Sequence, residues 1–350
     1  MFNDDIGSRK DDHIRINLEE DVSFSHLTTG LAQYRFEHQA LPEIDLDAIR
    51  TDITFLGKRL SFPLLIGSMT GGSPTAGRIN RFLAEAAQKL GVGMALGSIR
   101  AALELPQLAS TFQVREIAPD CLLLVNLGAV QLNYGYGIDE CRRALDLSGA
   151  DALILHLNPL QEALQVGGNT RFAGLLNRIE SICKGLNAPV IVKEVGHGIS
   201  EQVARQLVDA GVSALDIAGA GGTSWSQVEL HRSATPNQQE IAAAFRDWGI
   251  PTVEALEQTR RAAPTLPLIA SGGLRTGVDI AKVLALGADV ASMAGALLPA
   301  AMVSAAAVAE QLAIFEAQLR IAMFAAGAGN IAELQCTSLV KTQGYRAKDG

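Results

Sequence analysis

Cysteine is scarce in this sequence, and its placement suggests neither a metal site nor a disulfide framework. The four cysteines, Cys121, Cys141, Cys183 and Cys336, are scattered, with no Cys-x-x-Cys pair and no matching histidine spacing. Basic residues are also in deficit, since 29 Lys and Arg stand against 37 Asp and Glu and the net charge is −8. These absences argue against a zinc domain, a disulfide-rich secreted domain and a nucleic-acid-binding protein.

The sequence also lacks an apolar leader and a convincing membrane span. Its first twelve residues are rich in Asp, Arg and Lys, which is unlike a signal peptide. The one long uncharged segment, 290–309, is mostly Ala, Gly and Ser around Pro299. We expect a strand, a turn and the beginning of a helix there, rather than a membrane helix. The expected protein is cytoplasmic, with no membrane or nucleic-acid partner.

What is present favours a large α/β domain. Hydrophobic residues make up 48% of the 350 residues and charged residues 19%, enough apolar material for a sizeable core. From residue 64 onward, short apolar runs alternate with helical stretches. Such runs are typical of parallel strands that are buried on both faces. The eight runs are 64–67, 92–96, 121–125, 152–155, 189–192, 214–217, 267–270 and 288–293.

Helix signals separate these runs. Apolar residues from Ile79 to Leu90 recur with helical spacing, and Thr276 with Asp279 forms a capping box. Glycines stand where several helices should end. The cycle predicts a (β/α)₈ TIM barrel over residues 61–350, as a single domain, with a doubly wound open sheet as the alternative. Residues 1–60 form an N-terminal extension that wraps or caps the barrel, and the long strand 6–helix 6 connection, 219–251, covers the active face.

Polar residues follow the predicted strands at the ends where barrel enzymes carry their sites. Small, glycine-containing pairs follow the last two runs, Gly272-Gly273 and Ala294-Gly295, and Thr223 follows the sixth. Backbone N–H groups in such loops can bind a phosphate. The alternative is that these glycines only relieve crowding at turns.

The segment 271–282, with 284–288, resembles the phosphate-binding segment of FMN-dependent barrel enzymes, including the α-hydroxy-acid oxidases. Those oxidases carry a histidine base after strand six, whereas residues 218–225 contain none. Further motifs, spread in order over nearly the whole chain, resemble the type 2, FMN-dependent isopentenyl-diphosphate delta-isomerases. They are Arg9-Lys10-x-Asp12-His13, Ser68-Met69-Thr70-Gly71-Gly72, Gly97-Ser98-x-Arg100, His156-Leu157-Asn158-x-x-Gln161-Glu162, Val192-Lys193-Glu194-Val195-Gly196-x-Gly198-x-Ser200 and Gly219-x-Gly221-Gly222-Thr223-Ser224-Trp225. Two departures are Ile99, where that family has glutamine, and the turn 166–169.

The resemblance implies FMN, Mg²⁺ and NADPH as cofactors, with NADPH needed only to reduce the flavin, and a homo-oligomer of four or eight subunits. Lys193 would stabilise the reduced flavin, unless it pairs with Glu194. Glu162 would bind Mg²⁺, unless it is only a first-turn helix acid. The full set of implied FMN contacts is Ser68, Met69, Thr70, Ser98, Asn126, Lys193, Thr223, Gly273, Leu274, Arg275, Ala294 and Gly295.

The implied reaction converts isopentenyl diphosphate into dimethylallyl diphosphate by a 1,3-allylic rearrangement, with reduced FMN as acid and base. Implied catalytic residues are Gln161, His156 and Asn158; implied substrate contacts are Arg9, Lys10, His13, Ser98, Arg100, Gln161 and Ser200. Each has a plainer alternative: His156 as a core histidine, Ser200 as a helix cap, and the cations near residue 10 as a solvated charge run. Rival functions are an FMN oxidoreductase acting on a hydroxy acid and a non-catalytic FMN- or phosphate-binding protein.

Overall fold

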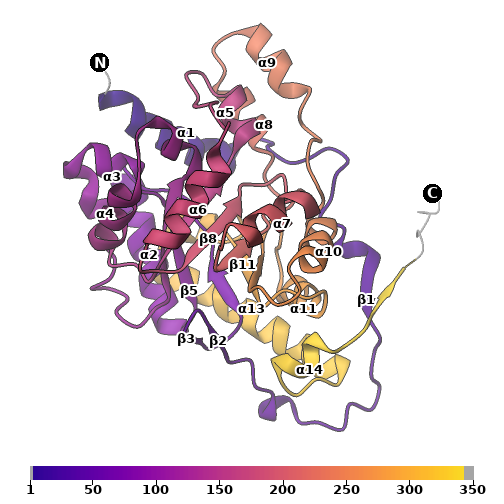
Figure 1. Ribbon diagram of the computed structural model, residues 1–350. Helices are drawn as coiled ribbons and strands as arrows, with labels where there is room; N and C mark the ends of the chain where they lie inside the picture. Colours follow the sequence, from indigo (N-terminus) through magenta and orange to yellow (C-terminus); the bar gives the residue numbers. More distant parts are fainter. Residues whose placement is uncertain (1–2, 343–350) are drawn as a thin grey trace.

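Eight parallel strands close into a barrel in the computed structural model, which describes residues 3–342 (Figure 1). Each strand pairs with its neighbour in sequence, and the last pairs with the first, so the predicted barrel is confirmed and the open sheet is excluded. The barrel strands are β4 (Leu64–Ile66), β5 (Gly93–Ser98), β6 (Leu123–Gly128), β7 (Ala152–Leu157), β8 (Val190–Glu194), β9 (Ala214–Asp216), β10 (Leu268–Ala270) and β11 (Val290–Met293).

The connecting helices cover the outside of the barrel, as the periodicity predicts. Ser73 caps the first of them by accepting a hydrogen bond from the Ala76 N–H, and the capping box of Thr276 and Asp279 is present. The helices are α2 (Pro74–Leu90), α3 (Arg100–Glu104), α4 (Ile138–Ser148), α5 (Pro159–Leu164), α6 (Leu175–Gly185), α7 (Glu201–Asp209), α10 (Thr252–Ala262), α11 (Gly277–Ala285), α12 (Leu298–Val303), α13 (Ala305–Ala326) and α14 (Ile331–Gln335).

Strand alternation builds the barrel interior in two levels. The lower level is an apolar cluster to which every barrel strand contributes, namely Leu65, Ala95, Leu124, Ile154, Ile191, Ala214, Ile269 and Val290. Side chains two residues apart on a strand share a face. The second level is therefore small or polar, and consists of Gly67, Gly97, Asn126, His156, Lys193, Asp216, Ser271 and Ser292. A dry core thus supports a polar ring at the carboxyl ends of the strands.

The N-terminal segment contacts both ends of the barrel. Helix α1 (Asn3–Glu19) packs against α2 and α8 (Trp225–Arg232) at the carboxyl ends of the strands. The antiparallel hairpin of β2 (Ile53–Phe55) and β3 (Lys58–Leu60) lies at the opposite end (Figure 1). There Phe55 and Leu60 join the apolar interior cluster and close it off from water. Between these elements, β1 (Tyr34–Phe36) pairs with β12 (Leu339–Lys341).

The long connection between β9 and β10 adds two helices before α10. Helix α8 and helix α9 (Pro236–Ala243) pack together, and α8 also contacts α5 and α1 above the strand ends. This confirms that the long connection covers the carboxyl face. The uncharged segment 290–309 forms β11, α12 and the first turn of α13, as predicted. Within residues 3–342, no helix is both long and apolar enough to cross a membrane.

Two arginine clamps tie the amino-terminal ends of barrel strands together. Arg115 donates to backbone carbonyls three, four and six residues ahead and to the carboxylate of Asp151 at 2.8 Å. Arg260 makes the same set of bonds, with Asp289 as its acid at 2.8 Å. The planar guanidinium suits this task because it presents several donors in fixed directions.

Replacing a clamp arginine should destabilise the barrel without touching the site. We expect Arg260→Lys to lower the free energy of unfolding by about 1–3 kcal/mol, because a single ammonium leaves several carbonyls unpaired. Urea unfolding with an unchanged m-value measures this. The control is Arg261→Lys, which alters an exposed ion pair with Glu201 and should cost less than about 1 kcal/mol. Equal losses in the two variants would contradict the role of the clamp.

Candidate active site

Two adjoining cavities open at the carboxyl ends of the strands. The larger has a volume of about 630 Å³, and the smaller about 150 Å³. The first lies over β4, β10, β11 and the loop after β9, whereas the second lies over β5, β6, β7 and α5. Both are bordered by Lys10, His13, Ser68, Met69, Lys193, Val195 and Trp225. The cavities therefore share a wall and form one composite site.

The larger cavity collects ten of the twelve predicted FMN contacts. These are Ser68, Met69, Thr70, Lys193, Thr223, Gly273, Leu274, Arg275, Ala294 and Gly295. The other two, Ser98 and Asn126, line the smaller cavity. A volume of 630 Å³ lies within the range of cofactor sites, about 300–1,000 Å³. The hydroxyl of Thr70 is buried and has no partner among the described residues, so it is available to a bound molecule.

The glycines of the predicted phosphate-binding loops differ in how much space a side chain would find there. A Cβ at Gly272 would lie 2.0 Å from the carbonyl oxygen of Gly219, and one at Gly273 2.5 Å from that of Gly221. Both glycines have positive φ and lie against the loop at Gly219–Gly221, so crowding at the turn explains part of the requirement for glycine. The close approach of these two loops forms one wall of the larger cavity. Gly295 is different, since a Cβ there meets no described atom within 4 Å. The short helix α12 follows, where barrels often place a phosphate.

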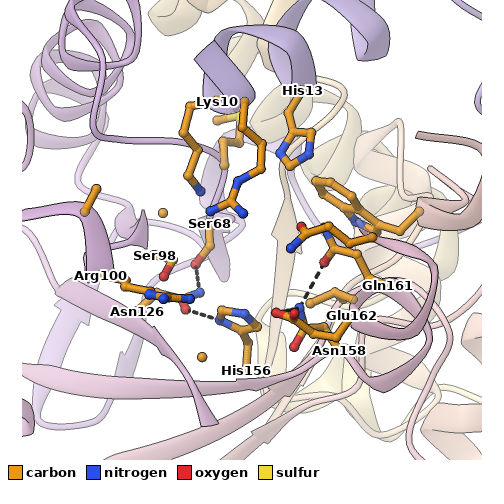
Figure 2. A pocket seen from close by; sticks show the side chains of 18 of the residues that line it. Lys10, His13, Ser68, Ser98, Arg100, Asn126, His156, Asn158, Gln161 and Glu162 are labelled. Carbon is orange, nitrogen blue, oxygen red and sulfur yellow. Dashed lines mark hydrogen bonds between the residues drawn. The ribbon is translucent and has the colours of Figure 1, made fainter. Parts of the chain in front are cut away.

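A hydrogen-bonded chain from three strands borders the smaller cavity (Figure 2). Asn126 donates from Nδ2 to Ser68 Oγ at 2.9 Å, and its Oδ1 lies 2.6 Å from His156 Nδ1. The amide oxygen can only accept, so Nδ1 carries the proton and Nε2 is left as an acceptor. Burial, together with the charges of Lys10 and Lys193, lowers the pKa of His156 to about 3. The imidazole is therefore neutral, and it is more than a packed core histidine because it lines the cavity.

The beginning of α5 supplies a second polar group. Asn158 donates to Gln161 Oε1 at 3.1 Å and to Glu162 Oε1 at 3.2 Å. The Asn169 N–H donates to Glu162 Oε2 at 2.6 Å, so the divergent turn 166–169 still binds this acid. Gly168 is required there, since a Cβ would lie 1.9 Å from the Glu162 carbonyl oxygen. Asn158 Oδ1 is buried without a hydrogen-bond partner among the described residues, and it leaves an oxygen ligand free beside a carboxylate.

Glu229, on α8, belongs to this site, and the sequence reading missed it. Its carboxylate accepts from Gln161 Nε2 at 3.2 Å and from Arg232 Nη1 at 3.0 Å, and it lies 3.5 Å from His13 Nε2. Burial opposes its ionisation, but the hydrogen bond and charge of His13, together with Arg232, outweigh burial and lower the pKa of Glu229. The signal that could have found it is its position one helical turn after Trp225, whose ring contacts His13.

The cations of α1 reach into the smaller cavity rather than into solvent. Figure 2 shows Lys10 and His13 coming from the helix toward Ser68, Asn126 and His156. Burial and the charge of Arg9 lower the pKa of Lys10 to about 8. Burial, Arg232 and Arg100 lower the pKa of Arg9 in the same way. Cations brought together against their own repulsion form a site suited to a multiply charged anion. The solvated-run alternative is wrong.

Three other sequence expectations meet the structure differently. Ser200 lines neither cavity; it caps α7 by accepting from the Val203 N–H at 3.4 Å, so substrate contact stays a prediction. Ile99 is buried in the core, away from the cavity linings. Glu194 does not pair with Lys193 through its carboxylate, which accepts the backbone N–H groups of residues 195–197 instead.

No cluster of three or more histidine, cysteine or acidic side chains with metal-binding geometry occurs in the part of the chain that the structure describes. Any metal here would rely on Glu162, the amide oxygen of Asn158, and ligands from a bound anion. Mg²⁺ is commonly bound in this way, by one or two carboxylates together with phosphate oxygens and water.

The fold and the composite site define the class of protein. The profile of the FMN-dependent dehydrogenase family matches residues 160–341. Among solved structures, a mandelate oxidase variant with benzoyl-formic acid has a TM-score of 0.67 at 19% identity and covers 97% of this chain and 98% of its own. A lactate oxidase of Pediococcus acidilactici has a TM-score of 0.66 at 18% identity, with 96% and 94% coverage. These likenesses show a shared barrel fold.

Sequence relatives narrow the class further. The isopentenyl-diphosphate delta-isomerase of Nostoc sp. is 52% identical over 94% of this chain and 94% of its own length. That of Stutzerimonas stutzeri is 52% identical, with 97% and 99% coverage, and that of Oceanobacillus iheyensis is 50% identical, with 98% and 99% coverage. The chain belongs to the isopentenyl-diphosphate delta-isomerase family.

Proposed function

We propose that this enzyme interconverts isopentenyl diphosphate and dimethylallyl diphosphate, with FMN in the larger cavity and the substrate in the smaller. The observation that carries the proposal is the shared wall. It places the anion-binding cations of α1 and the Asn158–Gln161–Glu162 group directly beside a cavity of FMN size. The names of the relatives support the same reaction.

The predicted FMN contacts suit the cofactor. Lys193 stands between the cavities and favours a reduced, anionic flavin, while the loops at Gly273 and Gly295 receive the phosphate. Ser98 and Asn126 reach the cofactor from the side of the smaller cavity. Bound there, reduced FMN supplies a proton-transfer group beside the alkene, and NADPH serves only to reduce it.

The diphosphate is bound by the α1 cations. Arg9, Lys10 and Arg100 surround the cavity, and each charge-assisted bond contributes about 1.5–3 kcal/mol. Burial lowers the pKa of His13, so its contact with the diphosphate does not depend on a positive charge. Glu162 and the free oxygen of Asn158 would hold Mg²⁺, which would neutralise part of the remaining phosphate charge. Helix α1 also excludes water from the site, which protects a carbocation-like state of the alkene.

Gln161 is the residue that meets the alkene. Asn158 fixes its amide oxygen and Glu229 fixes its amide nitrogen, so the side chain presents one face to the substrate and can relay a proton toward Glu229. Neutral His156 offers Nε2 as a further acceptor. We assign Gln161, His156 and Asn158 as catalytic residues on this basis, and Ser200 as a substrate contact on the motif alone.

The organisation that we propose is a single FMN-binding barrel domain, 61–350, with residues 1–60 as its arm and cap. We further propose a cytoplasmic homo-oligomer of four or eight subunits. A hydroxy-acid oxidoreductase would need a base after β9, and residues 218–225 contain no histidine. A non-catalytic binding protein would not account for Gln161 and Glu162 or for Arg9 and Lys10 around the smaller cavity, and substituting either pair should leave it unaffected.

The decisive test is anaerobic. Protein with FMN and Mg²⁺, its flavin reduced by dithionite, receives isopentenyl diphosphate without any nicotinamide. Many turnovers of dimethylallyl product per flavin, with the flavin still reduced at the end, are expected. Absence of dimethylallyl product, together with oxidation of the flavin by an added acceptor, would contradict the isomerase proposal and favour an FMN oxidoreductase.

A metal titration tests the assignment of Glu162. We expect Glu162→Gln to raise the Mg²⁺ concentration for half-maximal activity by about 10-fold or more, since a neutral amide is a weaker ligand. Glu140→Gln is the control, because it alters a carboxylate that accepts from the Gly137 N–H at 2.7 Å and lines neither cavity. A wild-type titration curve for Glu162→Gln would rule out metal ligation by this residue.

A further inference from the structure

Asp216 is a buried acid in the polar ring of the barrel, and the reaction proposed above does not use it. It lies in direct register with Lys193 across the β8–β9 pair, and strand alternation points both side chains into the barrel. Asp216 Oδ2 lies 3.8 Å from Lys193 Nζ, with side-chain exposures of 4% and 12%. Because both side chains are largely buried, this ion pair lies in a region of low dielectric and is not a solvent-exposed surface pair.

The same carboxylate reaches the next strand. Its Oδ1 accepts a hydrogen bond from the hydroxyl of Ser271, at the end of β10 and at the start of the glycine loop that lines the larger cavity. Asp216 therefore links the lysine on β8 to the cofactor-cavity segment on β10. One side chain ties together three successive strands at the level where the cavity begins.

The backbone beyond Asp216 is strained. Ala218, two residues on, has a φ of 37°, a conformation that residues other than glycine rarely adopt, and it lines the larger cavity. Strain of this kind persists where surrounding contacts hold it, and it is common at functional sites.

We propose that Asp216 is a positioning residue that tunes the midpoint potential of the bound flavin through Lys193. This inference rests on the FMN site of the proposed function. Lys193 Nζ donates a hydrogen bond to the Glu194 carbonyl oxygen at 2.6 Å, and the Asp216 carboxylate attracts the same ammonium from 3.8 Å while it accepts from the hydroxyl of Ser271. The carboxylate thereby helps to orient the ammonium and offsets part of the positive charge that Lys193 presents to the flavin.

The charge balance has a measurable consequence. Reduced FMN is more negative than oxidised FMN, so a nearby carboxylate disfavours the reduced form and a nearby ammonium favours it. Removing the carboxylate leaves the ammonium unopposed. The expected result for Asp216→Asn is a shift of the bound-flavin midpoint potential to a more positive value, which equals tighter binding of reduced relative to oxidised FMN.

A double-mutant cycle separates this role from a general structural one. Burial raises the pKa of Asp216, and the charge of Lys193 counteracts that effect. In a Lys193→Met background the ammonium through which Asp216 acts is gone, so Asp216→Asn should then shift the potential little. The potentials of the four FMN-loaded proteins are measured by anaerobic dye-coupled reduction.

The controls keep the outcomes distinct. Asp151→Asn removes an acid that pairs with an arginine at the opposite end of the barrel, and it should lower thermal stability while leaving the potential unchanged. If Asp216→Asn does not fold, Asp216→Ser removes the same charge with a smaller side chain. An unchanged potential, or an equal shift in the Lys193→Met background, would overturn the inference while wild type still binds FMN. Failure of wild type to bind FMN would overturn the proposed function and this inference with it.

Discussion

Replacing Gln161 with alanine should lower kcat by about 10²–10⁴-fold while KM for the diphosphate changes little. This range is typical for the loss of a positioned proton-transfer group. The side chain meets the alkene in the proposed complex, whereas the diphosphate contacts lie on α1 and at Arg100, so the loss should fall on the chemical step. Steady-state kinetics of the dithionite-reduced enzyme measures both constants.

Gln227→Ala is the matched control. Gln227 is also a buried amide on the covering elements, but its Nε2 bonds to Ser226 Oγ and to the Ala242 carbonyl oxygen instead of facing a cavity. It should cost stability and leave kcat near wild type. Glu229→Gln keeps the shape of the pair and tests the relay, and we expect a loss of kcat in the same direction. Wild-type kcat in Gln161→Ala would remove this residue from the chemistry.

Replacing Gly295 with leucine should weaken FMN binding without unfolding the protein. A Cβ at Gly295 meets no described atom within 4 Å, so the apoprotein has room for the side chain. The same space is where we place the cofactor phosphate. Forcing atoms into an occupied space costs about 1–3 kcal/mol, which corresponds to about 5- to 150-fold in the dissociation constant of FMN.

Flavin fluorescence quenching gives that constant, and thermal unfolding of the apoprotein gives stability. Gly137→Leu is the control: a Cβ there lies 3.8 Å from Glu140 Oε2 and in neither cavity lining, so FMN affinity should be unchanged. Gly273→Ala should behave in a third way, with loss of both stability and affinity, because its Cβ would meet the Gly221 carbonyl. Wild-type FMN affinity in Gly295→Leu would show that the phosphate lies elsewhere.

The barrel could be predicted from the sequence because each strand is a short apolar run, buried on both faces, and is followed by a helix. Capping residues and glycines in the sequence mark where several of these helices begin and end. Site residues directly after the apolar runs, such as Asn126, His156 and Lys193, were predictable for the same reason. Asp216 was missed because it lies inside its run, where only the two-residue alternation with Ala214 marks it as facing the barrel interior. Glu229 was missed because it comes from a long connection, and no strand end predicts where such a helix packs.

Residue type could not decide how the individual polar groups are used. From the sequence, Ser200 suits a helix cap as well as a ligand contact, and the structure shows the helix cap. Glu194 stands beside a lysine in sequence, yet its carboxylate binds backbone N–H groups, because alternation turns the two side chains to opposite faces. Lys10 looks like a surface residue in a polar tail until α1 folds it over the strands.

The two arginine clamps mark a repeat within the barrel. Arg115 and Asp151 brace β6 and β7, and Arg260 and Asp289 brace β10 and β11, with the same spacing of bonded carbonyls and the same strand-start N–H on the acid. β6 and β10 are the third and seventh strands in barrel order, half a turn apart. Gly128 and Gly273 follow at equivalent places, one on the wall of the smaller cavity and one on that of the larger. The chambers proposed for substrate and cofactor are thus counterparts related by a half-turn about the barrel axis.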